Sequence, residues 1–438
     1  MASEWHDARF AQLCEHSAFG PRFAGELYAP DGNVATLRTT DISADGRIEY
    51  ETMPLARLDL SRLQQHTLRP KDLVITRSGR IGTAALFNGF RLPVLPGAFL
   101  IRFRLKTDVA EPLFYRYFFN SRAGQELLTS VATGSVQQNL NITSVHGLEV
   151  PVPPLADQRA IAHILGTLDD KIELNRRMNE TLEAMARALF KSWFVDFDPV
   201  RAKAEGHDPG LPKPLADLFP DSFEDSELGE IPKGWEVRPF AGIVEIIGGG
   251  TPKTSVAEYW DGEIPWFSVV DAPNGADVWV VDTEKKITRE GVENSSTRIL
   301  PVGTTIISAR GTVGRIALVG VPMAMNQSCY GLQGKEDRRE FFMYFATREL
   351  VACLRQHAHG SVFDTITRDT LAGVSVAAPS AELIEAFETR VGSSMERIRA
   401  GLFESRTLAA LRDALLPKLI SGELRVKDAD DLVQEATV

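Results

Sequence analysis

The feature that most constrains how this chain can fold is a long internal repeat. Three blocks of the first half align with three blocks of the second, at offsets between 226 and 232 residues: 5–20 with 235–250, 68–87 with 300–319, and 134–154 with 360–380. In the third pair six of 21 positions are identical, namely Gly134, Ser135, Val136, Gly147, Val150 and Pro153. Repeat units of this length are whole domains, because solenoid units are shorter and stack in larger numbers. The chain therefore contains two domains of one kind.

Two related domains give a protein approximate two-fold character. The length of 438 residues agrees with two or three domains. Such a protein suits a ligand that itself offers two sites, and DNA with two separated half-sites is a natural candidate.

Each repeat begins with a segment that predicts mixed α and β structure. Short β-branched runs at 73–75 and 305–307 are followed by glycines, the pattern of a strand that ends in a turn. Further strands are expected at 86–87, 318–319 and 149–152, and helices at 115–128 and 341–354. The predicted fold class is α/β, in the mixed α+β sense.

Each repeat ends with a segment that predicts a long helix. Residues 157–193 contain one glycine and no proline. Apolar residues recur there near heptad spacing, at Ile161, Ile164, Leu168, Met178, Leu182, Met185 and Leu189, and in the second repeat at Phe387, Leu408, Leu411 and Leu415. The pattern is interrupted by Lys171, Asn175, Arg397 and Gly401. Each helix packs on its own domain, or the two pair antiparallel and cover each other's apolar stripes.

Charge is distributed unevenly along the chain. The net charge is −11, which as a total opposes DNA binding, but local clusters form the electrostatic footprint for phosphates. One cluster has a single acid, Asp72, among nine bases: Arg62, Arg69, Lys71, Arg77, Arg80, Arg91, Arg102, Arg104 and Lys106. A smaller cluster contains Lys285, Lys286, Arg289, Arg298, Arg310 and Arg315. A solvated face is the alternative interpretation of both.

The residues best suited to touch DNA lie on glycine-rich turns and polar loops. The turns at 77–82 and 309–315 combine arginines with glycines, which allow a close backbone approach. Arginine contacts phosphates or guanine, and Gln or Asn can read adenine. The predicted DNA-binding residues are Arg77, Ser78, Arg80, Gln137, Gln138, Asn139, Lys253, Arg310, Thr312, Arg315 and Ser361, with structural glycines at Gly79, Gly82, Gly311 and Gly314. The alternatives are a β-turn with solvated arginines and an ordinary polar loop.

Sequence signatures of catalysis are missing. The chain has no nucleotide-cradling G-x-x-x-x-G-K-[ST] loop, no G-x-G-x-x-G after a strand, no H-E-x-x-H and no C-x-x-C. It also lacks the Asn-Pro-Pro element that amino-methyltransferases use. We expect no catalytic residues and no metal site in this chain.

The remaining composition suggests a cytoplasmic protein. Cys14, Cys329 and Cys353 are scattered singly, which fits a reducing compartment and buried structural thiols. No membrane helix or secretory signal is expected, because no apolar run is long enough and the N-terminus lacks a basic, then apolar, region.

Four stretches resemble the specificity subunits of type I restriction–modification systems. They are LGEIPKGWEV (228–237), GGTPKTSVAEYWDGEIPWFSVVD (249–271), ISARGTVGRIAL (307–318) and KSWFVDFDPVRAKAEG (191–206). The resemblance covers nearly the whole chain. The first repeat departs from the pattern, because RSGRIG stands where ARGTVG is expected and no GGTP or YW element lies near Gly20.

The resemblance implies two target-recognition domains separated by two long helices that form an antiparallel coiled coil. The expected boundaries are recognition domains at 1–154 and 233–380, helices at 155–198 and 381–425, a linker at 199–232 and an acidic tail at 426–438. It also implies a non-catalytic subunit that binds double-stranded DNA and carries two methyltransferase subunits and motor–nuclease subunits. S-adenosylmethionine, ATP and Mg²⁺ would bind those partners. Helix faces near Leu182 and Leu408, and residues 193–199, are the expected docking region.

Three other functions remain open. The chain could be a stand-alone tandem DNA-binding module without partners, or a nuclease with a dispersed metal site, which would cut DNA alone. It could also be a tandem module for a ligand other than nucleic acid, whose binding would be indifferent to salt, unlike binding to phosphates.

Overall fold

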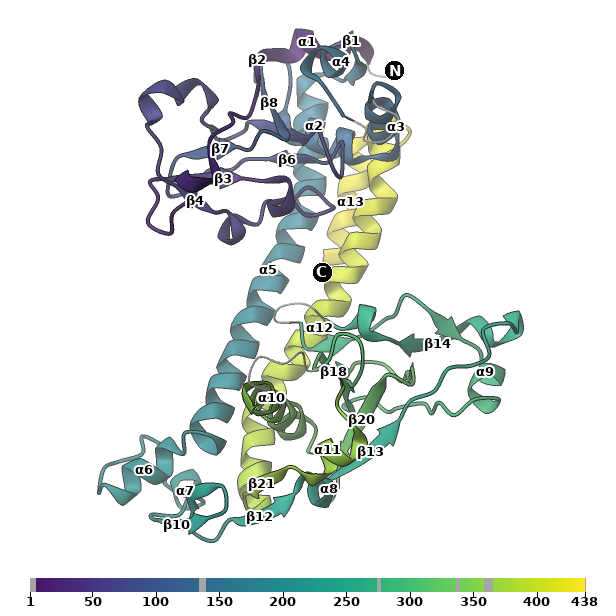
Figure 1. The fold of residues 1–438 in the computed structure, drawn as a ribbon. Coiled ribbons are helices and arrows are strands. Elements are labelled where there is room, and N and C mark those ends of the chain that lie inside the picture. Colours follow the sequence, from purple (N-terminus) through teal and green to yellow (C-terminus); the bar gives the residue numbers. More distant parts are fainter. Residues whose placement is uncertain (1–4, 134–138, 274–276, 336–338, 358–364, 438) are drawn as a thin grey trace. The chain divides into compact units, whose positions relative to one another are not determined.

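The computed structural model describes residues 5–133, 139–273, 277–335, 339–357 and 365–437. The chain divides into two compact units, Met1–Lys171 with Thr407–Val438, and Ile172–Arg406. Each unit contains one of the repeated domains, here called the first head (5–154) and the second head (233–380), together with part of each long helix (Figure 1).

The first head consists of short strands and helices around a buried four-stranded sheet in the order β2-β8-β5-β6. A second sheet has the order β4-β3-β7, and β1 pairs with β9. The strands are β1 (His6–Arg9), β2 (Cys14–Phe19), β3 (Val34–Leu37), β4 (Leu55–Ala56), β5 (Leu73–Thr76), β6 (Ala84–Leu86), β7 (Val94–Pro96), β8 (Leu100–Leu105) and β9 (Glu149–Val152). The helices are α1 (Phe10–Leu13), α2 (Pro112–Asn120), α3 (Arg122–Ser130) and α4 (Ile142–His146).

The second head repeats this plan. Its main sheet has the order β13-β20-β17-β18-β15, its second sheet β16-β14-β19, and β12 pairs with β21. The strands are β12 (Glu236–Pro239), β13 (Val244–Gly248), β14 (Trp260–Phe267), β15 (Trp279–Val280), β16 (Lys286–Ile287), β17 (Thr305–Ser308), β18 (Ile316–Val319), β19 (Ala324–Met325), β20 (Cys329–Gly334) and β21 (Ser375–Ala378). The helices are α8 (Phe240–Ile243), α9 (Arg289–Glu293), α10 (Glu340–His357) and α11 (Arg368–Gly373). The predicted mixed α/β class and the tandem repeat are confirmed.

The two heads differ where the sequence predicted one helix in each. In the second head α10 is continuous, whereas in the first head Ser121 separates α2 from α3. Ser121 has extended backbone angles (φ −70°, ψ 162°), and its side chain accepts a hydrogen bond from the Gly124 N–H, so it ends one helix and caps the next.

Two 40-residue helices, α5 (Leu155–Phe194) and α12 (Ala381–Ile420), form the predicted antiparallel pair (Figure 1). Within Ile172–Arg406, the Asn175 side chain donates to Ser405 Oγ at 3.3 Å, and the Trp193 and Phe387 rings lie 6.1 Å apart. A later residue on α5 therefore meets an earlier one on α12, as antiparallel pairing requires.

The seam of α5 is a strict heptad that includes four predicted residues, Ile161, Leu168, Leu182 and Leu189, while its other position lies one residue later than predicted. The residues that face inward are at least half-buried and alternate at spacings of three and four: Ile161, Leu165, Leu168, Ile172, Asn175, Asn179, Leu182, Ala186, Leu189 and Trp193. The predicted seam residue Met185 is instead 62% exposed. Polar Asn179 and small Ala186 occupy seam positions where the hydrophobic pattern predicted Met178 and Met185. Gly401 lies opposite Asn179, where an added Cβ would come within 3.0 Å of its Oδ1.

The segment predicted as a linker at 199–232 is folded. It forms α6 (Asp198–Ala204), α7 (Lys213–Ala216) and the hairpin β10 (Phe223–Ser226) with β11 (Gly229–Pro232). Its prolines start helices, as at Pro199 and Pro214. Phe219 packs edge-on against Trp193 at 5.2 Å, so the segment is held by its own share of the second unit's core.

The segment predicted as an acidic tail also has structure. It forms helix α13 (Val426–Thr437), on which Ala429 and Val433 are buried. Before it, the Trp5 ring packs against Gly422, whose φ of +73° suits glycine. The N-terminal and C-terminal stretches of the chain therefore belong to the same unit.

Candidate nucleic-acid interface

The same glycine turn is present in both heads, after β5 in the first and after β17 in the second. Gly82 N–H donates to Thr76 O at 2.8 Å, and Gly314 N–H donates to Ser308 O at 2.9 Å. The hydroxyl groups of Thr76 and Ser308 each donate to a carbonyl in the turn, those of Arg80 and Thr312. These pairs are equivalent positions of the repeat, so each head encloses its turn with the same hydrogen bonds.

Glycine is needed at two positions of each turn. The φ angles of Gly79 and Gly82 are +77° and +83°, and those of Gly311 and Gly314 are +78° and +77°. L-residues with a side chain rarely adopt this conformation. At the tips Arg80, Arg310 and Thr312 are exposed. The turn thus has the same backbone in both heads and presents different side chains.

The predicted polar loops join these turns. In the first head Leu140 N–H donates to Arg77 O at 3.0 Å, and in the second Ile366 N–H donates to Ala309 O at 2.9 Å. Asn139 is half-buried and exchanges two backbone hydrogen bonds with Thr133, at 2.8 and 3.0 Å. Gln137, Gln138 and Ser361 lie outside the described residues. The structure thus brings together two segments that are about 60 residues apart in sequence, from residue 77 to 140.

Three predicted DNA-binding residues have internal partners. Arg77 Nε donates to Leu140 O at 3.2 Å, and its guanidinium lies 4.6 Å from the centroid of the Phe19 ring. Ser78 is buried. Arg315 Nη2 donates to Ala272 O and Pro273 O, at 3.1 and 2.9 Å. These contacts hold neighbouring segments against the turn, and a role of these residues in DNA binding stays a prediction.

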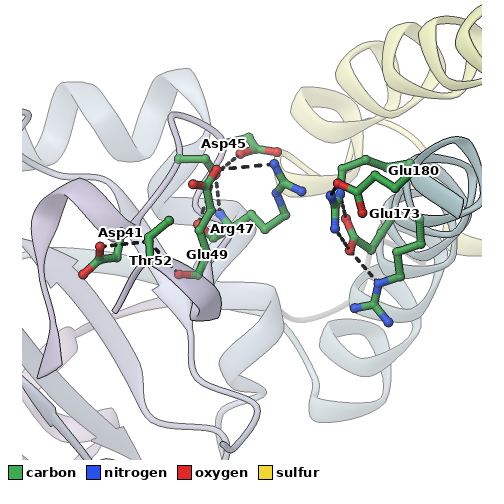
Figure 2. A network of polar contacts seen from close by, with 10 residues as sticks. Asp41, Asp45, Arg47, Glu49, Thr52, Glu173 and Glu180 are labelled. Atoms are coloured by element: carbon green, nitrogen blue, oxygen red, sulfur yellow. Dashed lines mark hydrogen bonds and ion pairs between the residues drawn. The ribbon is translucent and has the colours of Figure 1, made fainter. Parts of the chain in front are cut away.

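Arg315 contacts the end of an element that the sequence analysis did not predict. A short 3₁₀ turn, Val269–Asp271, comes directly before Ala272 and Pro273. The first head has the equivalent turn at Thr39–Asp41. In each turn the aspartate accepts a hydrogen bond from the backbone N–H three residues earlier, Ser268 for Asp271 and Arg38 for Asp41. Asp41 also accepts from the Thr52 hydroxyl at 2.9 Å (Figure 2). The matched aspartates of the repeat were the available signal.

Lys253 is exposed on a loop of the second head whose glycines serve packing. A Cβ at Gly249 would lie 1.9 Å from Asn326 O, and one at Gly250 would lie 2.4 Å from Thr297 N. The loop is covered by an edge-on tryptophan pair, Trp260 and Trp266, with centroids 5.2 Å apart. The glycine run here allows chain segments to touch, and it does not form a phosphate cradle.

The basic cluster of the first head is partly internal. Arg102 is 1% exposed and donates to Gln65 O at 2.7 Å and to His16 Nδ1 at 2.6 Å. Arg104 forms a bidentate ion pair with buried Asp72, at 2.8 and 2.7 Å. Burial, together with these two arginines, lowers the pKa of His16. Arg102 therefore cannot reach a phosphate.

Within the described residues, no group of three or more His, Cys, Asp or Glu side chains could hold a metal ion.

The prediction of three buried thiols is wrong for Cys353, which is exposed. Cys329 is buried, and this burial raises the pKa of its thiol to about 12. Among the described helices none is long and apolar enough to cross a bilayer.

The predicted docking residues Leu408 and Trp193 are buried, while Leu174 and Met185 of α5 are exposed.

Comparison with known proteins agrees with this architecture. Residues 2–184 and 232–383 match the family described as Type I restriction modification DNA specificity domain. The chain is 28% identical over 343 residues to the type I restriction enzyme HindI specificity subunit of Haemophilus influenzae, covering 68% of this chain and 74% of that protein. It is 33% identical over 162 residues to the MjaIX specificity subunit of Methanocaldococcus jannaschii, covering 36% and 38% of the two chains.

A solved structure has the same fold. The crystal structure of the type I restriction–modification S subunit from M. genitalium superposes with a TM-score of 0.60 at 16% identity, and the match covers 95% of this chain and 96% of that one. The family match extends over both heads and well into α5. The chain therefore belongs to the family of type I restriction–modification DNA specificity subunits.

Proposed function

We propose that this chain is the non-catalytic subunit that recognises an asymmetric, two-part DNA sequence, with each head reading one half-site. The observation that carries the proposal is the turn after β5 and β17. Its backbone hydrogen bonds are the same in both heads, but its exposed side chains are Arg80 in one head and Arg310 and Thr312 in the other. Identical frames with different side chains suit two different base sequences.

The chemistry is assigned to partners: two methyltransferase subunits that bind S-adenosylmethionine, and motor–nuclease subunits that use ATP and Mg²⁺. Two observations support this division, namely the lack of nucleotide-binding motifs in the sequence and of a metal-ligand group within the described residues. For the methyltransferases we propose the face of α5 that includes Leu174 and Met185. These apolar side chains are 54% and 62% exposed and lie three helical turns apart.

The test is a map of methylated adenines in a host that carries this chain and its methyltransferase partner. We expect one motif made of two different half-sites separated by a gap of fixed length. The purified chain alone should transfer no labelled methyl groups and cut no DNA. Methylation or cleavage by the chain alone, or a single continuous motif, would contradict the proposal.

A further inference from the structure

One carboxylate on α5 receives hydrogen bonds from three side chains on two other helices. Asp169 accepts from Arg116 Nη1 at 2.9 Å and from the Tyr117 hydroxyl at 2.6 Å, both on α2 of the first head. It also accepts from Arg412 Nη1 of α12 at 2.7 Å. All four residues belong to the same unit, so Asp169 connects the head with both long helices.

The environment keeps Asp169 ionised. Burial alone would raise the pKa of this carboxyl, but Arg116 and the hydrogen bonds from Tyr117 and Arg412 hold its pKa below the ordinary value. Only 20% of the side chain is exposed, and Tyr117 is 4% exposed. Hydrogen bonds to a charged, partly buried acceptor are strong and directional. These hydrogen bonds favour one position of α2 on the helix pair. Apolar contacts alone would not select a single position, because they are not directional.

The second head has a related contact with α5. Glu183, 4% exposed, forms an ion pair with Arg348 of α10, whose guanidinium lies 5.9 Å from the centroid of the Tyr344 ring. In the first head the matching distance, from Arg116 to Tyr117, is 4.9 Å. Asp169 and Glu183 are fourteen residues apart on one helix, which is two heptads, so both follow a seam residue by one position. In each head an arginine thus pairs with a carboxylate at the same heptad position of α5.

We propose that Asp169 is a positioning residue that fixes where the first head lies on the helix pair. It thereby restricts the length of the gap between half-sites that the complex accepts. The inference rests on the proposed function, since it concerns the same bipartite recognition. Asp169 touches no DNA in this scheme. It acts through Arg116 and Tyr117, which set where α2 lies.

The test uses the complex with its methyltransferase subunits and duplexes that carry the mapped half-sites with gaps from two pairs shorter to two pairs longer. We expect the parent to methylate one gap length. In Asp169→Asn an amide NH2 replaces one acceptor oxygen and faces donors, so the preference for the parental gap over its neighbours should fall about tenfold or more. The half-site bases should stay the same.

Two variants make the result decisive. Glu173→Gln removes another carboxylate from α5, one that pairs with Arg176 and Arg177 of the same helix (Glu173 is labelled in Figure 2), and it should keep the parental preference. Tyr117→Phe removes one donor to Asp169 and keeps the ring, so it should relax the gap partly even if Asp169→Asn fails to fold.

Equal loss of methylation at every gap length in both Asp169→Asn and Tyr117→Phe would show that the cluster only stabilises the fold, and would overturn the proposal. Unchanged gap preference in both variants would overturn it too. Failure of the proposed function would look different, because the parent itself would then show no bipartite motif.

Discussion

Two arginines of one turn lie in different surroundings. Arg310 is exposed at the tip after β17, whereas Arg315 is half-buried and donates to Ala272 O and Pro273 O. The sequence predicted both as DNA contacts, because a linear pattern cannot tell which side chain folds back on the protein. The same holds for Arg77, which lies against Phe19. The sequence therefore predicted where arginines and glycines lie in the turn, but it did not predict which arginine side chains point away from the protein.

The single substitutions Arg310→Ala and Arg315→Ala should therefore behave differently. Loss of a phosphate contact at Arg310 should reduce the slope of log affinity against log salt by about one, and loss of a base contact should cost about 1–3 kcal/mol and relax one position. Thermal unfolding should be unchanged. Loss of two carbonyl contacts at Arg315 should instead lower the free energy of unfolding by about 1.5–3 kcal/mol.

The measurements are DNA titrations of the complex over a range of salt concentrations, with urea unfolding of each chain beside them. If Arg310→Ala leaves both the affinity and the salt slope at the parental values, this turn belongs to the fold and not to the interface.

A carboxylate from another helix lies at the N-terminus of helix α10. Glu388 of α12 accepts from the backbone N–H groups of Phe342 at 2.7 Å and Phe341 at 3.4 Å. Those N–H groups have no partner inside the helix, so Glu388 satisfies them. Burial raises the pKa of Glu388 from 4.5 to about 7, against the effect of these two hydrogen bonds. No pattern in the sequence indicated this contact, because its partners lie 46 residues apart.

Glu388 should make the stability of the protein depend on pH. Its pKa is higher in the folded state, so the folded chain holds a proton that the unfolded chain releases between pH 4.5 and about 7. Stability is therefore present below this window and is lost as pH rises through it, by at most about 3 kcal/mol. In Glu388→Gln this component of the loss should vanish.

The check is urea unfolding at pH 5 and pH 8 for the parent, Glu388→Gln and the matched control Glu382→Gln, whose carboxylate is exposed on the same helix. The parent and the control should lose more stability than Glu388→Gln between the two pH values. Equal losses in all three would mean that Glu388 does not titrate in this window.

At the level of elements, the sequence predicted the types well and the details less well. The two long helices, their antiparallel pairing and the strands around the glycine turns are as expected. Half of the α5 heptad was as predicted, at Ile161, Leu168, Leu182 and Leu189, but the other half lies one residue later than predicted, since polar Asn179 and small Ala186 occupy seam positions. The frequent prolines of residues 199–232 predict a linker, whereas Phe219 and Ile231 belong to the buried core. Tertiary burial, which a local pattern does not contain, decided both cases.

On the scale of the whole molecule, the repeat was the most informative signal, because it predicted the two domains of one kind that the structure shows. Assembly with methyltransferase subunits can be tested through the exposed face of α5. The double variant Leu174→Glu with Met185→Glu places two charges on this face, and we expect at least one methyltransferase to be lost from the purified complex. Burying an unpaired charge at an interface is costly.

The mass of the complex, measured by native mass spectrometry, gives the readout. Leu228→Glu is the matched control, since Leu228 is 46% exposed on the β10–β11 hairpin and should leave the composition unchanged. Full composition in the Leu174 and Met185 double variant would assign the docking surface to another part of the chain.

The division of the chain into units has a consequence for its synthesis. The unit that contains the first head is completed by Thr407–Val438, which leave the ribosome only after the 235 residues of Ile172–Arg406. At about 5–20 residues per second this delay lasts roughly 12–47 seconds. During that time Asp169 has no Arg412 and Trp5 has no Gly422 to pack on. The first head to be translated is thus the last to be finished, and a nascent chain released early would carry an unsupported first head.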